Sequence, residues 1–106
     1  MSAAVNGGVL YQPFLAKDWI DPLTGEVVFT QSPIKKEQVI SEDTSAQIRN
    51  ALEHVVAKGT GKGAFVDGYR VGGKTGTAQK AKDGRYLENN HIVSFIGFAP
   101  ADDPQI

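Results

Sequence analysis

The sequence has 106 residues, with 11 Lys and Arg against 12 Asp and Glu, 41% apolar residues and no cysteine. This length fits one small domain, and the missing cysteines exclude a disulfide scaffold, a thiol nucleophile and a cysteine-based zinc site. The net charge of −1 gives no reason to expect nucleic acid as a partner. No apolar run approaches the roughly 20 residues that cross a bilayer, and no targeting signal follows Met1.

The charge is unevenly distributed along the chain. Between Lys58 and Arg85 there are seven basic and two acidic residues, whereas the rest of the chain is acidic. A locally basic stretch in a nearly neutral protein favours a small anionic ligand over a polyanion. A solvated surface explains the same pattern equally well.

The first 30 residues predict a helix end followed by a β-hairpin. Residues 2–5 are typical of a last helical turn, with Asn6-Gly7-Gly8 as its C-terminal cap. Residues 9–20 are rich in strand formers interrupted by Pro13, and the turn at 21–25 leads into the β-branched run 27–30. The isolated helix end and the C-terminal turn indicate a single partial domain over residues 1–106, truncated at both ends.

Residues 42–58 predict an amphipathic helix. Ser41 is a good N-cap, and the acidic residues Glu42 and Asp43 suit the positive end of the helix dipole. Apolar residues then recur at helical spacing, namely Ile48, Ala51, Leu52, Val55 and Val56. The helix ends at Lys58 and Gly59, and its apolar side is expected to cover a core.

The last third of the chain predicts two strands. Residues 69–79 lack helical periodicity, residues 81–90 form a polar connection, and residues 92–98 are a short run of β-branched and aromatic residues. A helix followed by two connected strands predicts the α+β class, with an antiparallel sheet backed by the helix.

One pattern in this region imitates a phosphate-binding loop. The residues from Gly68 to Thr75 match G-x-x-x-x-G-K-[ST]. Such a loop must leave a buried strand and open a helix, but Gly76-Thr77-Ala78 follows where the helix should begin. We therefore do not expect nucleotide binding.

A second pattern, Lys74-Thr75-Gly76-Thr77, combines a cation with two hydroxyl groups on a predicted strand. A glycine lets a ligand backbone lie against the strand, and a lysine with hydroxyl and amide donors can bind a peptide carboxylate. Backbone amides could also polarise a carbonyl, as in an oxyanion hole. From these four residues alone, an ordinary exposed strand with a Lys-Thr pair is the favoured interpretation.

A longer match supports a functional interpretation. The stretch from Gly59 to Lys80 resembles the K-T-G region of class B penicillin-binding proteins, and the similarity continues in Ser94–Pro100. It extends back through the helix beginning at Ile40 and through Asn6–Pro13. The resemblance covers nearly the whole chain in order, and it implies part of a penicillin-binding/β-lactamase-like transpeptidase fold.

The resemblance also implies an activity and a role for each motif residue. Family members are D,D-transpeptidases that cross-link peptidoglycan stem peptides through an acyl-serine intermediate and are acylated by β-lactams. By position, Lys74 would support the catalytic hydrogen-bond network, while Thr75 and Thr77 would bind the terminal carboxylate of the D-Ala-D-Ala donor. The Thr77 amide would serve the oxyanion hole, and Gly76 would keep the strand accessible to substrate.

The implied partners are the D-Ala-D-Ala stem peptide and β-lactams, with no cofactor, metal or nucleic acid. The parent protein would be anchored in the cell membrane, with its catalytic domain on the extracytoplasmic face and associated with the cell-wall synthesis machinery of division or sporulation. Two alternatives remain open: a non-catalytic β-lactam-binding or sensor relative, and a D,D-carboxypeptidase or β-lactamase-like acyl-serine enzyme.

The family also requires S-x-x-K and S-x-N motifs, which Ser32-Pro33-Ile34-Lys35 and Ser41-Glu42-Asp43 imitate. A nucleophile must begin a buried helix with its lysine one turn on, but Ser32 directly follows the predicted hairpin and Ser41 already has a role as an N-cap. We therefore expect the true serine motifs to lie outside this chain, so that the fragment alone would be inactive.

The remaining candidates favour structural roles. His54 is expected beside the polar side of the helix, and His91 at a loop end. Trp19 and Tyr11 are expected to pack within the hairpin rather than to bind a sugar.

Overall fold

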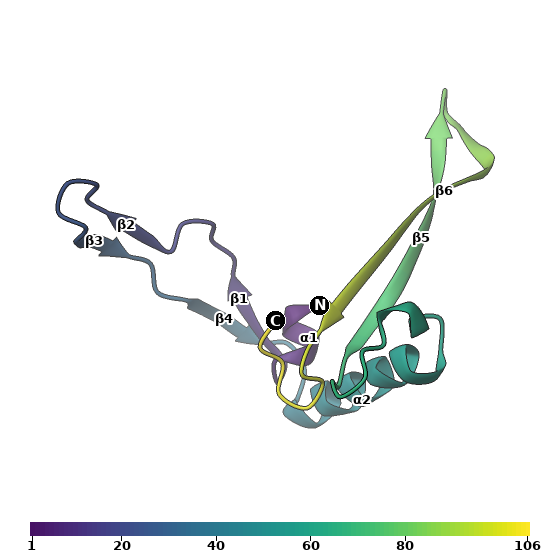
Figure 1. Ribbon diagram of the computed structural model, residues 1–106, viewed down its shortest axis with the longest axis horizontal. Coiled ribbons are helices and arrows are strands. Elements are labelled where there is room, and N and C mark those ends of the chain that lie inside the picture. Colours follow the sequence, from purple (N-terminus) through teal and green to yellow (C-terminus); the bar gives the residue numbers. More distant parts are fainter.

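The computed structural model describes residues 1–106. Its elements in chain order are α1 (Ser2–Val5), β1 (Val9–Gln12), β2 (Asp18–Ile20), β3 (Val27–Thr30), β4 (Ile34–Gln38), α2 (Glu42–Lys58), the 3₁₀ turn η1 (Lys62–Ala64), β5 (Gly72–Lys82) and β6 (Arg85–Phe98). The strands form three separate antiparallel pairs: β1 with β4, β2 with β3, and β5 with β6. Figure 1 shows two long strand arms diverging from a base that contains α1 and α2. The predicted α+β class is confirmed, and neither helix is long and apolar enough to span a membrane.

The first arm is longer than the predicted hairpin. The pair β2–β3 forms the predicted hairpin, and β1–β4 continues the arm toward the base. The Asp21 side chain fixes the turn by accepting a 2.8 Å hydrogen bond from the Leu23 amide, and Gly25 has a φ of 74° that favours glycine. No sequence pattern predicts β4, because its residues are all exposed and lack an apolar alternation.

Helix α2 has the predicted bounds. The Ser41 hydroxyl accepts a 3.1 Å hydrogen bond from the Thr44 amide, as an N-cap should. Val56 is buried, and Ile48, Leu52 and Val55 are half-buried. Ala51 was expected on the covered side but is exposed, because too little of the chain packs against this edge of the helix.

The small core lies where α1, α2 and the end of β6 meet. Val5, Phe98 and Ala101 are buried there, and Ala4 and Leu52 pack against them. Ser45 of α2 is fully buried beside this core. Its hydroxyl donates to the Ala4 carbonyl at 2.9 Å and accepts from the Gly7 amide at 3.0 Å. Ser45 therefore joins the end of α1 to α2.

The second arm corrects the predicted polar connection at residues 81–90. Strand β5 continues to Lys82, and β6 begins at Arg85. The two residues between them, Asp83 and Gly84, have φ values of 53° and 75°, the left-handed conformation of a tight hairpin turn. Because this turn needs only two residues, the polar residues beside it extend the strands. The expected strand at 69–79 also begins later, at Gly72.

Candidate active-site strand

The four residues of the K-T-G-T pattern lie together in the first half of β5. Across the pair, Lys74, Thr75, Gly76 and Thr77 face Ile96, Phe95, Ser94 and Val93 of β6. Strand β5 pairs only with β6. Its other edge therefore presents backbone N–H and C=O groups that an extended peptide could pair with.

The secondary structure after Lys74 excludes the phosphate-loop interpretation. The residues that follow Lys74 and Thr75 continue in β5 as a strand. A phosphate-binding loop requires a helix at this point, because the helix N-terminal amides hold the phosphate. The G-x-x-x-x-G-K-[ST] match is therefore a coincidence of sequence.

Lys74 and Thr75 contact each other. The Lys74 ammonium donates to the Thr75 carbonyl at 2.8 Å and lies 3.5 Å from the Thr75 hydroxyl. Lys74 is exposed and Thr75 is half-buried. The structure thus brings a cation and a hydroxyl together on one strand, as the carboxylate-binding interpretation requires.

Thr60 contacts the Lys74–Thr75 pair through Thr75, and the sequence did not predict this contact. Thr60 lies in the loop that follows α2, and its hydroxyl is 3.1 Å from the Thr75 hydroxyl on β5. A cavity of about 300 Å³ lies beside this contact, lined by Thr60, Gly61, Gly63, Ala64, Thr75 and Phe95. The residues 59–63 showed only a flexible glycine-rich loop, so no local pattern indicated the contact.

Gly76 and Thr77 are the last two residues of the K-T-G-T pattern. Thr77 is exposed, and its hydroxyl has no hydrogen-bond partner within the chain. A Cβ at Gly76 would lie 2.7 Å from the Ser94 hydroxyl oxygen, so no side chain fits there without a shift. The Thr77 hydroxyl is thus accessible, and the missing side chain at Gly76 leaves room for Ser94.

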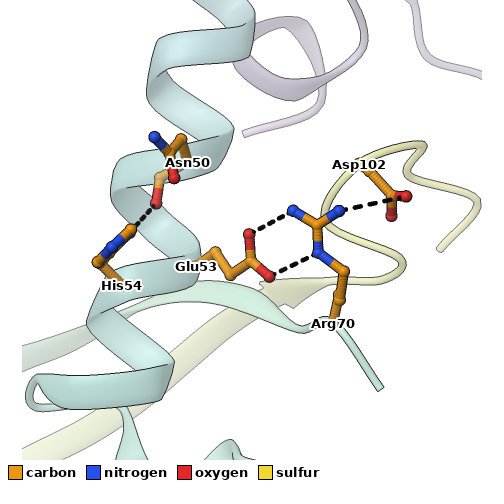
Figure 2. A network of polar contacts seen from close by, with 5 residues as sticks. All are labelled: Asn50, Glu53, His54, Arg70 and Asp102. Atoms are coloured by element: carbon orange, nitrogen blue, oxygen red, sulfur yellow. Dashed lines mark hydrogen bonds and ion pairs between the residues drawn. The ribbon is translucent and has the colours of Figure 1, made fainter. Parts of the chain in front are cut away.

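Figure 2 shows an ion-pair network immediately before this strand. Arg70 donates two 2.8 Å hydrogen bonds to the two carboxylate oxygens of Glu53 on α2. A second carboxylate, that of Asp102, lies 3.3 Å from the same guanidinium. The hydrogen bonds from Arg70 lower the pKa of Glu53, with the Arg70 charge adding to this effect and partial burial opposing it. The same contacts raise the pKa of Arg70.

The two serine patterns do not form catalytic motifs. Ser32 precedes β4, and Lys35 lies within that strand opposite Tyr11. Extended backbone separates residues three apart by roughly 10 Å, so this serine and lysine lack the helical proximity of S-x-x-K. Ser41 is the N-cap of α2, as predicted.

The histidines and aromatic residues have no catalytic setting. The His54 Nδ1 atom lies 2.8 Å from the Asn50 carbonyl oxygen within α2 (Figure 2), and His91 lies within β6 opposite Gln79 rather than at a loop end. Trp19 packs against Phe29 across the first arm, with ring centroids 5.5 Å apart. No group of three or more His, Asp or Glu side chains is placed to hold a metal ion.

Comparison with known proteins gives a consistent family. The sequence model of the penicillin binding protein transpeptidase domain matches residues 1–106. Stage V sporulation protein D of Bacillus subtilis is 76% identical over 106 residues, which are 100% of this chain and 16% of that protein. The probable peptidoglycan D,D-transpeptidase PenA of Neisseria meningitidis is 46% identical over 71 residues, which are 66% of this chain and 12% of that protein.

Solved structures agree. The D,D-transpeptidase domain of a peptidoglycan glycosyltransferase from Eggerthella lenta superimposes with a TM-score of 0.81 at 40% identity, covering 98% of this chain and 23% of that one. Penicillin binding protein 3 of Mycobacterium tuberculosis, complexed with ampicillin, gives a TM-score of 0.77 at 34% identity, covering 96% of this chain and 24% of that one. This chain therefore spans less than a quarter of the length of each of these relatives. It belongs to the penicillin-binding protein transpeptidase family.

Proposed function

We propose that these 106 residues form one side of the active site of a peptidoglycan D,D-transpeptidase. The observation that carries this proposal is the placement of Lys74, Thr75 and Thr77 on β5, which pairs with β6 along one edge and leaves its other edge unpaired. The names of the relatives support it, since PenA is a probable peptidoglycan D,D-transpeptidase. The coverage of 23% of the Eggerthella lenta domain supports the further proposal that the chain is part of a larger domain.

Each residue of the strand has a proposed role in substrate binding or in the reaction. The Lys74 cation supplies positive potential and holds the catalytic hydrogen-bond network, and the Thr75 and Thr77 hydroxyls bind the terminal carboxylate of a D-Ala-D-Ala peptide. The Thr77 amide donates to the oxyanion that forms at the penultimate D-Ala carbonyl. Gly76 lets the peptide backbone lie against the strand.

The proposed reaction proceeds through an acyl-serine. A serine hydroxyl outside these 106 residues attacks the penultimate D-Ala carbonyl, the C–N peptide bond breaks, and the terminal D-Ala leaves with the serine proton. An amine of a second stem peptide then displaces the serine and forms the cross-link. A β-lactam acylates the same serine, but its ring-opened amine stays attached.

We also propose a cellular location and a role for the parent protein. We place the parent protein in the cell membrane with its transpeptidase domain on the extracytoplasmic side, where peptidoglycan is cross-linked. The 76% identity to stage V sporulation protein D supports a role in cell-wall synthesis during sporulation.

The test is to find the acylated serine in the full-length protein that contains these residues. After incubation with a penicillin, proteolysis and mass spectrometry should locate one adduct on a serine outside residues 1–106, and Ser32→Ala should acylate like the unmodified protein. Incubation with a D-Ala-D-Ala stem peptide should release D-Ala and yield a cross-linked product. An adduct on Ser32, or no adduct at all, would contradict the proposal.

A further inference from the structure

The first two residues of β5 have no side chains that could anchor the strand to the rest of the fold, so the anchor comes from a residue before the strand. Gly72 and Gly73 open the strand just before Lys74, and both are buried. The Phe98 ring occupies the place of a Cβ at Gly72, and the Phe95 ring does the same at Gly73. These two glycines therefore allow close packing of the β6 rings but cannot themselves hold the strand against α2.

Arg70, two residues before β5, supplies such an anchor from three contacts. Its guanidinium makes the paired hydrogen bonds to Glu53 of α2 and the ion pair to Asp102, beyond the end of β6. Its backbone carbonyl accepts a 2.8 Å hydrogen bond from the Ala101 amide. One residue thus joins the segments before β5 and after β6 to the helix (Figure 2).

The geometry of these contacts indicates that Arg70 orients β5 relative to α2 more than it adds to the free energy of unfolding. Two parallel hydrogen bonds fix the plane of the guanidinium relative to the carboxylate, which a single-point ammonium contact does not do. The Arg70 side chain is 57% exposed and that of Glu53 is 22% exposed. Solvent screening leaves exposed ion pairs little effect on the free energy of unfolding, so the main consequence of the network is where β5 begins relative to α2.

We propose that Arg70 is a positioning residue for the reaction, which orients Lys74–Thr77 by tying the entrance of β5 to Glu53 and Asp102. This inference rests on the proposed transpeptidase function. Reacting groups must be held in a near-attack geometry, and a misplacement of about 1 Å can reduce a rate up to roughly 100-fold. Arg70 lies four residues before Lys74, so a shift at the entrance of the strand displaces the substrate-binding groups.

The test separates acylation from binding and from stability in the full-length protein. With a chromogenic β-lactam, Arg70→Gln should lower the first-order acylation rate constant roughly tenfold and raise the initial non-covalent dissociation constant by a smaller factor, because the near-attack geometry is more sensitive to displacement than binding is. Glu53→Gln should reproduce the loss, because it removes the carboxylate that holds the guanidinium. Asp102→Asn should lose less, since its contact is single and longer, at 3.3 Å. Arg70→Lys should recover part of the rate.

The matched control is Arg85→Gln, which removes an arginine at the far end of the same strand pair and should acylate like the unmodified protein. If Arg70→Gln fails to fold, Glu53→Gln decides the question. Unchanged acylation in both variants, an equal loss in Arg85→Gln, or a rate that falls only in step with the unfolding temperature would overturn the inference. Absence of any acylation in the unmodified protein would instead overturn the proposed function, and this inference with it.

Discussion

The Ser94 hydroxyl occupies the space that a side chain at position 76 would need. Its oxygen lies 2.7 Å from the Cβ position of residue 76 and 3.5 Å from the Gly76 carbonyl oxygen. Space for Ser94 from the neighbouring strand is thus one reason for glycine at this position, and the proposed access of a substrate backbone is a second. These two reasons predict different consequences of substitution.

Gly76→Ala should separate the two reasons. The Ser94 hydroxyl can rotate away from the new methyl group and gives up only a long hydrogen bond, so the unfolding temperature should fall slightly. The methyl group remains on the proposed substrate-binding surface, so β-lactam acylation should fall by roughly tenfold or more, as expected for misplacement of a reacting group. Both are measured on the full-length protein.

The control for this prediction is the double variant Gly76→Ala with Ser94→Ala. Removing the hydroxyl should restore the unfolding temperature without restoring acylation. Recovery of both together would mean that Gly76 is required only for packing against Ser94.

The Glu53–Arg70 pair predicts a pH dependence of stability. The pKa of Glu53 lies below its ordinary value of 4.5 in the folded chain. A carboxyl with a depressed pKa contributes stability that is present above the unfolded value and is lost as the pH falls through the folded value. Denaturant unfolding of the unmodified protein and of Glu53→Gln should therefore show a small difference in the free energy of unfolding at neutral pH, because the pair is partly exposed, and the two should converge as the pH falls below 4.5. A difference that persists unchanged in acid would contradict this assignment.

Ser45 predicts a purely structural effect. Ser45→Ala removes the hydroxyl that joins Ala4 and Gly7 to α2. Leaving buried groups unpaired costs about 1–3 kcal/mol in the free energy of unfolding. Denaturant unfolding measures this loss, and the acylation rate at a temperature where the variant is folded should not change. As a comparison, Ser41→Ala removes the exposed N-cap of α2 and should cost about 1 kcal/mol. A larger loss for Ser41→Ala than for Ser45→Ala would contradict the assigned burial.

The sequence predicted those elements whose signals are local. Helix α2 was predicted with its correct bounds because its cap, its first-turn charges and its apolar spacing all lie within residues 41–59. Strand β4 was missed because an exposed strand has no apolar alternation. The β5–β6 arm is longer than predicted because Asp83-Gly84 alone forms the turn and the polar residues beside it belong to the strands.

The candidate site divides in the same way. Lys74–Thr77 could be named from the sequence, because they are consecutive residues within a long stretch that resembles a known family. Thr60 and the Arg70 network could not be named, since their contacts join residues that are 15 and 17 positions apart. Only the folded arrangement of α2 beside β5 brings those residues together.

The most direct test of the account is the acylation rate of the full-length protein by a fluorescent penicillin, with and without Lys74→Ala. Lys80→Ala serves as the matched control, because Lys80 is an exposed lysine further along the same strand. We expect Lys74→Ala to lower the acylation rate at least roughly 100-fold, as loss of a group that stabilises developing charge does, while Lys80→Ala acylates like the unmodified protein. Equal rates for the unmodified protein and Lys74→Ala would contradict the assignment of β5 as the active-site strand.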